Sequence, residues 1–295
     1  MMVTALIAAI TIAFPKEGAQ LPSLSRVYML GATDGGETNL VVAGKDVPVY
    51  RTGAWATTVE LVPGTNVVTV GDCRRSFVVA SGQPYVETKK KYLKLEYAAD
   101  KPKAHPQGRD PSAITVAIDA GHGGKDVGAL SPHGWMEKDA NLLMAKAVRR
   151  ELMARGFKVV MTRDDDSAVE LYDRPKAAHS NGADAFVSIH HNAPPYDRDP
   201  IKCRYHTVYA WNEIGERLAK AVNLRMAKAF GEELEDQGVK HANFAVTRNP
   251  EIPSCLIEVD FVSSPAGEES IWDEKTRRRT ASAIADGITD WSRQP

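Results

Sequence analysis

The stretch that decides the fold of this chain is ITVAIDAGHGGKDVGALSPHGWMEKDAN, residues 114–141. It opens with an apolar, β-branched run that predicts a buried strand ending at Asp119. Closely spaced glycines then allow a tight turn around His122, and a helical pattern begins at Glu137. Ligands usually bind where loops leave the carboxyl ends of strands in an open α/β sheet. We therefore expect a functional site at this turn.

The rest of residues 113–295 alternates apolar strand patterns with helical patterns. This alternation predicts an α/β fold, a mixed open sheet flanked by helices. The expected strands after the first cover residues 157–162, 185–190, 206–211 and 254–261. The expected helices cover residues 138–155, 173–180, 213–230 and 275–292.

The first third of the chain has a different pattern. Residues 10–87 contain short β runs separated by turn signals, which predicts a small all-β sandwich. Residues 88–112 are rich in lysine and proline and are expected to form a linker. Residues 1–9 are an apolar leader, interpreted either as part of a signal peptide or as the approach to the first strand. The apolar run is too short to form a transmembrane segment.

Composition restricts the classes of function. The chain has 43% hydrophobic and 25% charged residues, which is typical of a globular protein with a substantial core. Its net charge of −1 gives no reason to expect nucleic acid or an anionic membrane as the main partner. Its 3 cysteines are too few and too scattered for a disulfide framework or a cysteine metal site.

Further polar residues stand where they could complete a metal site. His190 ends an apolar strand, as His122 follows one. Together with Glu137 they offer two imidazoles and one carboxylate, a ligand set that leaves Zn2+ an open position for water. Glu258 lies within the apolar run SCLIEVDF, where a buried carboxylate is costly unless it has a partner. We interpret Glu258 as the general base.

Each of these residues taken alone could be structural, but their joint placement at strand ends favours a site. Strand alternation points His191 to the other face from His190, so we expect it to be structural. Asp119 could orient a ligand. The other histidines have no comparable context, although His241 follows a loop that could border the site.

Residues 113–295 resemble the zinc-dependent N-acetylmuramoyl-L-alanine amidases of bacterial cell-wall turnover. The resemblance is carried by IDAGHGG at 118–124, EKDAN at 137–141, MTRDDD at 161–166, NGADAFVSIHHNA at 181–193, QGVKHANFAV at 237–246 and PSCLIEVDFVSSPAGEE at 253–269. It implies that His122, Glu137 and His190 bind zinc and that Glu258 is catalytic. Two departures are His191, where a small residue is usual, and Asp260, which adds a charge near the site.

The resemblance also implies a substrate and a location. The expected reaction is hydrolysis of the amide between N-acetylmuramic acid and L-alanine in peptidoglycan, in cell-wall turnover or daughter-cell separation. We expect a monomer in the periplasm, in the cell envelope or secreted. The segment from Asn192 to Tyr205 is short, whereas partner-switched division amidases insert a blocking helix there, so the site is expected to be open. Residues 10–87 resemble bacterial immunoglobulin-like modules, which act as spacers or bind the wall.

Other functions remain open at this point. A zinc-dependent sugar deacetylase or a peptidoglycan endopeptidase would need the same metal and base. A cell-wall-binding protein without activity belongs to a different class, and the presence of all the required side chains argues against it.

Overall fold

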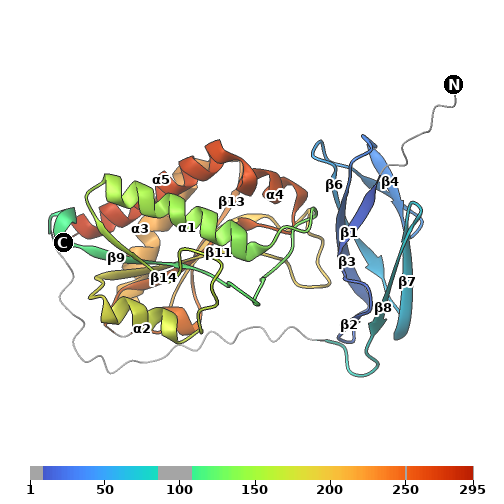
Figure 1. The fold of residues 1–295 in the computed structure, drawn as a ribbon, viewed down its shortest axis with the longest axis horizontal. Helices are drawn as coiled ribbons and strands as arrows, with labels where there is room; N and C mark the ends of the chain where they lie inside the picture. The colour runs from blue at the N-terminus through green and yellow to red at the C-terminus, as the bar shows by residue number, and fades with distance from the viewer. Residues whose placement is uncertain (1–8, 86–107, 250, 295) are drawn as a thin grey trace.

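The computed structural model describes residues 9–85, 108–249 and 251–294. Most of the predicted leader and residues 88–107 of the predicted linker lie outside the described residues. Figure 1 shows two regions, an N-terminal one built of strands and a C-terminal one in which helices cover a sheet. Within the described part of the chain, no helix combines the length and the apolar character needed to cross a bilayer.

The N-terminal region consists of two packed sheets. One sheet has the order β1-β3-β6, with β1 at Ile10–Phe14, β3 at Arg26–Thr33 and β6 at Ala54–Glu60. The other has the order β2-β8-β7-β4-β5, with β2 at Ala19–Leu21, β8 at Cys73–Val79, β7 at Gly64–Val70, β4 at Asn39–Val42 and β5 at Lys45–Pro48. Trp55, Met29 and Phe77 are fully buried between them. The all-β prediction is confirmed, and the immunoglobulin-like resemblance stays a prediction.

The C-terminal region is organised around one sheet with the order β10-β9-β11-β14-β12-β13. Its strands are β9 (Thr115–Ala120), β10 (Lys158–Met161), β11 (Ala185–Asn192), β12 (Tyr205–Ala210), β13 (Glu235–His241) and β14 (Ser254–Phe261). The strands from β10 to β14 in this order are parallel, whereas β12 pairs antiparallel with β14 and parallel with β13. The predicted mixed sheet is therefore confirmed.

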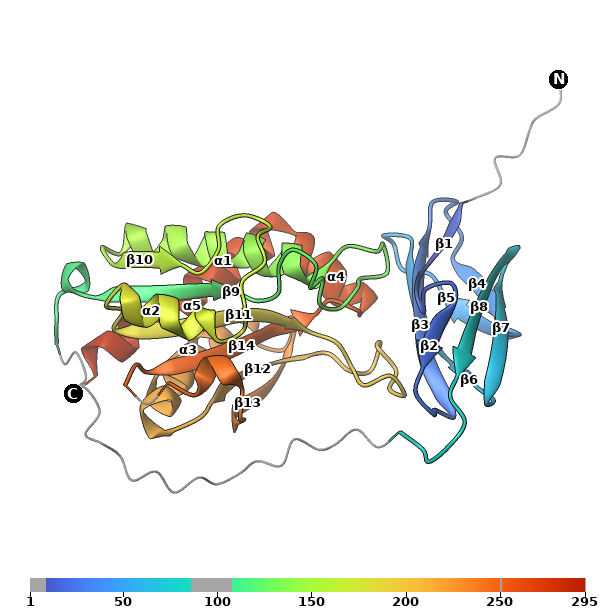
Figure 2. The ribbon, with the colours of Figure 1, turned by 60° about the horizontal axis from the view of Figure 1, so that its bottom comes forward.

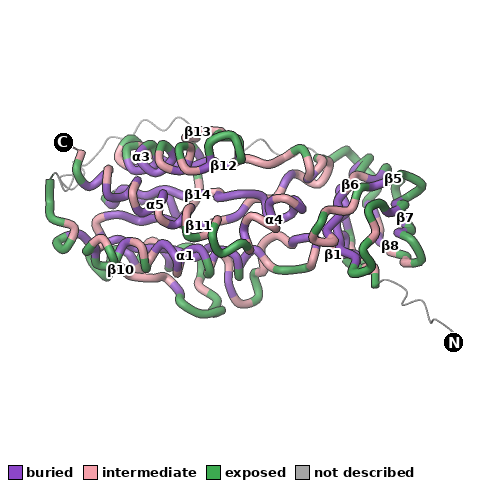
Figure 3. The backbone as a smooth tube through the Cα atoms, turned by 90° about the horizontal axis from the view of Figure 1, so that it is seen from above, coloured by how far each residue is buried: buried purple, intermediate pink, exposed green. Residues whose placement is uncertain are grey.

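Helices cover both faces of this sheet (Figure 1). One face packs against α1 (Glu137–Ala154), α3 (Glu213–Phe230) and α5 (Glu274–Arg293) in one large apolar cluster. The other face packs against α2 (Asp173–Ser180) and the 3-10 turn at Ala245–Thr247. Figure 3 shows that buried residues run through β11, β14 and α5 in the middle of this region. Strands that are covered on both faces explain why β9, β11 and β14 read as continuous apolar runs.

The predicted helices agree with the observed ones to within a residue at each end. Their ends have visible causes: Gly156 follows the last turn of α1 with φ 92°, and Asn212 caps the start of α3 by accepting a hydrogen bond from the Gly215 N–H at 2.9 Å. Two elements were missed, β13 and the helix α4 (Pro265–Trp272). The strand β13 has the polar sequence EDQGVKH at a sheet edge, so no apolar alternation marks it.

Candidate metal centre

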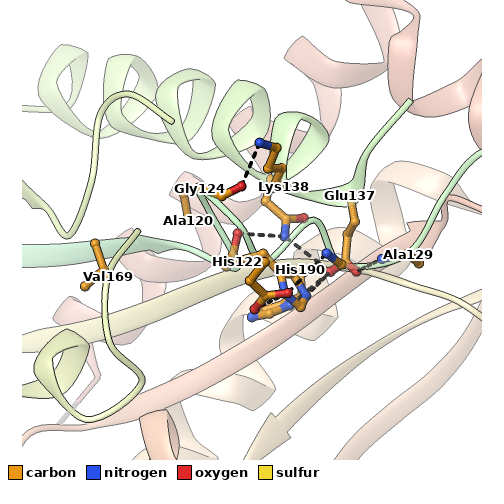
Figure 4. A network of polar contacts seen from close by, with 12 residues as sticks. Ala120, His122, Gly124, Ala129, Glu137, Lys138, Val169 and His190 are labelled. Atoms are coloured by element: carbon orange, nitrogen blue, oxygen red, sulfur yellow. Dashed lines mark hydrogen bonds and ion pairs between the residues drawn. The ribbon is translucent and has the colours of Figure 1, made fainter. Parts of the chain in front are cut away.

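Three side chains predicted as metal ligands come together at the carboxyl end of the sheet. His122 lies in the loop after β9, Glu137 begins α1 and His190 lies near the end of β11 (Figure 4). Their ligand atoms all lie within 4.8 Å of one another. Glu137 Oε1 is 3.1 Å from His122 Nε2 and 3.1 Å from His190 Nδ1. Among the described residues, this is the group whose chemistry and spacing could hold a metal ion.

The spacing of these atoms fits a small tetrahedral cation. Zinc bonds nitrogen and oxygen ligands at about 2.0–2.2 Å, which places two ligand atoms of a tetrahedron about 3.4 Å apart. The observed separations of 3.1 Å from the Glu137 oxygen to each imidazole are close to that value. Two imidazoles and one carboxylate also match the donor set of hydrolytic zinc sites.

The backbone of the loop after β9 is shaped around these ligands. His122 adopts a left-handed conformation with φ 61°, which is uncommon for a residue with a Cβ and typical of functional sites. A Cβ on Gly121 would lie 2.2 Å from Nε2 of His190. A Cβ on Gly128 would lie 2.5 Å from a carboxylate oxygen of Glu137. Glycine at these two positions therefore lets the ligands approach the main chain.

Electrostatics at the cluster favour a positive charge. Burial alone would lower the pKa of His122, but hydrogen bonds and attraction from Glu137 and Asp126 raise it to about 9. Burial alone would raise the pKa of Glu137, but His122 and His190 hold that pKa well below its usual range. The carboxylate is thus ionised at neutral pH, and a metal cation can take the place of the proton that His122 would otherwise hold.

Besides Glu137, the carboxylate of Asp126 contacts a candidate ligand histidine. Its Oδ2 lies 2.8 Å from Nδ1 of His122, which leaves Nε2 facing Glu137. The sequence also suggested Asp119 as a residue that could orient a ligand. The fully buried Asp119 accepts hydrogen bonds from Thr162, Ser188 and Arg174. The spacing of four residues between His122 and Asp126 was the signal available in the sequence.

Two buried arginines hold the backbone of the metal loop. Arg174 donates hydrogen bonds to the carbonyl oxygens of Ala120 and His122, both at 2.8 Å. Arg163 donates to the carbonyl oxygens of Ala120 at 2.9 Å and Gly121 at 2.8 Å. The motif MTRDDD contains Arg163, but the sequence alone had suggested no role for it. Both side chains satisfy carbonyl groups that the tight turn leaves without strand partners.

Glu258 lies next to the cluster. It is the register partner of His190 in the parallel pair β11–β14, and it is half-buried. Residues paired in register on neighbouring strands project from the same face of a sheet, so Glu258 and His190 share a face. Asp260, expected to add a charge near the site, is buried and bonded to Arg204, with Nη2 to Oδ2 at 2.8 Å. Burial raises the pKa of Asp260, against the opposing effect of Arg204.

The other histidines lie elsewhere. His191 is buried on the side of α1, where its Nδ1 is 2.8 Å from Oδ1 of Asn141, and burial lowers its pKa to about 4. Asn141 in turn donates to Oε1 of Glu137 at 3.2 Å. His241 does not border the site, because it lies on β13 with its Nε2 3.4 Å from Glu216. His105 lies outside the described residues.

Comparisons with known proteins agree with this geometry. A family model described as N-acetylmuramoyl-L-alanine amidase matches residues 116–290. The chain is 32% identical over 222 residues to the N-acetylmuramoyl-L-alanine amidase AmiC of Neisseria meningitidis, which covers 62% of this chain and 53% of that protein. It is 29% identical to AmiA of Salmonella typhimurium, over 72% of this chain and 86% of that protein.

A solved structure shows the same fold. The N-acetylmuramoyl-L-alanine amidase AmiC2 of Nostoc punctiforme superimposes with a TM-score of 0.58 at 34% identity. The superposition covers 61% of this chain and 98% of that one. The family match begins at residue 116, so the N-terminal β region lies outside it.

Proposed function

This chain belongs to the N-acetylmuramoyl-L-alanine amidase family, and from that premise we propose that His122, Glu137 and His190 hold a catalytic zinc ion while Glu258 moves the protons of the reaction. The reaction of the family is hydrolysis of the amide that joins N-acetylmuramic acid to L-alanine in peptidoglycan. The observation that carries the proposal is the convergence of two imidazole nitrogens on one ionised carboxylate, each at 3.1 Å.

The metal and the protein have separate tasks. When bound, Zn2+ would supply Lewis acidity, which polarises a water molecule and the scissile carbonyl group. Glu258 accepts a proton from the attacking water and returns it to the nitrogen of the departing L-alanine. Its place beside His190 on the neighbouring strand supports this role, because proton transfer requires the base within hydrogen-bond reach of the water.

The polar residues around the cluster keep the ligands in place. Asp126 holds Nδ1 of His122, so that Nε2 is the nitrogen available to the metal. Asn141 and the main-chain N–H of Ala129 donate to the two oxygens of Glu137, at 3.2 Å and 2.9 Å. These bonds fix the carboxylate before the metal arrives, which reduces the cost of ordering it on binding.

The substrate class also suggests where the protein acts. Peptidoglycan lies outside the cytoplasmic membrane, so we place the protein in the periplasm, in the cell envelope or outside the cell. Relatives described as probable cell wall amidases agree with that location. The monomeric state stays a prediction.

Glu258→Gln tests the proposal. The amide keeps the size of the side chain and removes the base, so release of a free L-alanine amino group should fall about a hundredfold to ten-thousandfold. Zinc content should stay that of the unmodified protein. The control is Glu232→Gln, the same change at an exposed position, which should leave both unchanged. Near-normal turnover by Glu258→Gln would assign the base to another group.

The product identifies the bond that is cleaved. Release of acetate would indicate a sugar deacetylase, and a new amino terminus further along the stem would indicate an endopeptidase. If the zinc-loaded protein released no product from the substrate, a wall-binding function would be indicated.

A further inference from the structure

One short segment links the two regions of the molecule by main-chain and ring contacts, and Arg51 and Glu269 form an ion pair between the regions at a second place. Residues 193–204 join β11 to β12 and reach the outer face of the sheet β1-β3-β6, which Figure 2 shows as the loop nearest the N-terminal region. The main-chain N–H of Tyr28 donates to the carbonyl oxygen of Tyr196 at 2.8 Å. The ring of Tyr196 stacks on that of Phe14, with centroids 5.8 Å apart and planes at 4°. The segment that follows the ligand strand is therefore anchored to the β region.

A cleft of about 540 Å³ lies at this junction. Its β-region wall includes Phe14, Lys16, Tyr28 and Tyr85, and its other wall is formed by residues 127–130 and 193–196. Pockets for small organic ligands have volumes of about 300–1,000 Å³. The cleft is large enough to hold part of a substrate, and both regions are needed to form it.

The second wall of the cleft belongs to the metal centre. The N–H of Ala129 donates to Oε2 of Glu137 at 2.9 Å, and Gly128 lies against the same carboxylate. Residues 193–196 begin three positions after His190 on the same continuous strand and loop. A substrate whose scissile amide sits at the metal centre would therefore extend past residues that line this cleft.

The lining of the cleft has a particular chemistry. It is aromatic and aliphatic, and its charged member is the exposed Lys16. The neighbouring carboxylate of Glu17 is engaged with Arg75, 3.6 Å away. Tyr85 is 44% exposed, with its ring 6.2 Å from that of Tyr196. A cation beside exposed aromatic surface suits a ligand that combines carboxylates with short aliphatic side chains.

We propose that this cleft binds the acidic stem peptide of the substrate, so that the β region forms one wall of the substrate site. The inference rests on the proposed function, because the peptide begins at the nitrogen of the scissile amide. The stem carries free carboxylates that Lys16 can attract, whereas the glycan on the other side of the amide is the less acidic part. Charge therefore favours the peptide over the sugar chain as the occupant.

Kinetics with two substrates test this assignment on the full-length, zinc-loaded protein. One substrate is N-acetylmuramoyl-L-alanine amide, whose peptide ends after one residue, and the other is an N-acetylmuramoyl tetrapeptide with its free carboxylates. For Lys16→Gln we expect KM for the tetrapeptide to rise about fivefold, the factor that about 1 kcal/mol of lost attraction produces. The value of kcat and the KM for the short amide should not change. Tyr85→Ala should shift the same KM, and Lys16→Arg should restore it.

Matched controls separate this effect from general damage. Lys45→Gln removes an exposed lysine of the β region outside the cleft, and Tyr172→Ala removes an exposed tyrosine of the other region. Both should leave KM unchanged, and all variants should keep the zinc content and thermal midpoint of the parent. An unchanged KM for the tetrapeptide in Lys16→Gln and Tyr85→Ala would overturn the inference. A rise in KM that depends on the length of the glycan instead of the length of the peptide would also overturn it. Failure of the parent protein to cleave either substrate would overturn the proposed function itself.

Discussion

The two regions of this protein bury different kinds of side chain. In the described part of the β region, residues 9–85, the buried polar side chains are the uncharged Thr33 and Asn66. The α/β region buries several charged side chains, namely Asp119, Glu137, Lys138, Arg163, Arg174, Asp260 and Glu268. Burying a charge costs stability unless it is paired, so a fold that tolerates many such residues holds them for another reason. Most of these charged side chains belong to the cluster of His122, Glu137 and His190 or support the loop around it. In this protein, buried charge therefore marks the region that carries the candidate site.

The largest expected effect on activity comes from removing a proposed metal ligand. Glu137→Ala removes the carboxylate on which both imidazoles converge, so zinc binding should be lost and hydrolysis with it. Removing a residue that only hydrogen-bonds to a metal ligand lowers metal affinity or activity by about tenfold to a hundredfold, and the loss in Glu137→Ala should be larger. Metal analysis and turnover on a muramoyl peptide measure it. Chelation of the parent protein should have the same effect on turnover, and activity that survives both treatments would contradict the metal assignment.

The second contrast concerns a buried ion pair. Arg174→Met leaves Asp119 buried without its cationic partner and removes one hydrogen bond from each of the carbonyl groups of Ala120 and His122, so the free energy of unfolding of the α/β region should fall by about 3–5 kcal/mol. Denaturant unfolding measures this loss. The exposed pair Lys176–Asp173 on the same helix is the control, because Lys176→Ala should cost under about 1 kcal/mol. Equal losses of unfolding free energy in Arg174→Met and Lys176→Ala would show that the buried ion pair contributes no more to stability than the exposed one.

The third contrast tests the apolar core of the β region. Met29→Ala creates a cavity beside Trp55 and should lower the free energy of unfolding by about 2–5 kcal/mol. Turnover of N-acetylmuramoyl-L-alanine amide should stay that of the parent at temperatures where the β region is folded. Val67, on the same region but 47% exposed, provides the control Val67→Ala. A fall in turnover of the short amide would show that the β region supports the metal centre directly.

Periodicity and strand ends were enough to predict the α/β fold. The long helices and the buried strands follow local patterns, and His122, Glu137 and His190 could be grouped because parallel strands bring their carboxyl ends to one edge. The supporting residues were not predictable in this way. Arg163 and Arg174 donate to backbone carbonyls of the metal loop that lie 42 to 54 residues away in the sequence, and no local pattern encodes such a contact.

The cleft between the regions was also beyond the sequence. It depends on how Tyr196 packs against Phe14 and Tyr28, which is a contact between two folded surfaces. The sequence predicts a spacer or a wall-binding module for residues 10–87, since it shows no cluster of chemically active side chains there. The structure brings aromatic side chains from this region to a cleft that is also lined by residues 127–130 and 193–196.

The register of β11 against β14 means that the number of residues in β14 decides which side chain lies beside His190. Glu258 faces His190 because Phe186 pairs with Ser254 and the following pairs stay in step as far as His190, after which the register shifts. A single residue lost or gained in β14 would set Ile257 or Val259 opposite His190, since a slip of one position reverses the faces of a strand. Such a protein would keep the three proposed metal ligands and its core composition but would no longer place the Glu258 carboxylate beside them. Natural variation in the length of this strand should therefore produce metal-binding proteins that do not cleave, and insertions should be tolerated only in the loops outside it.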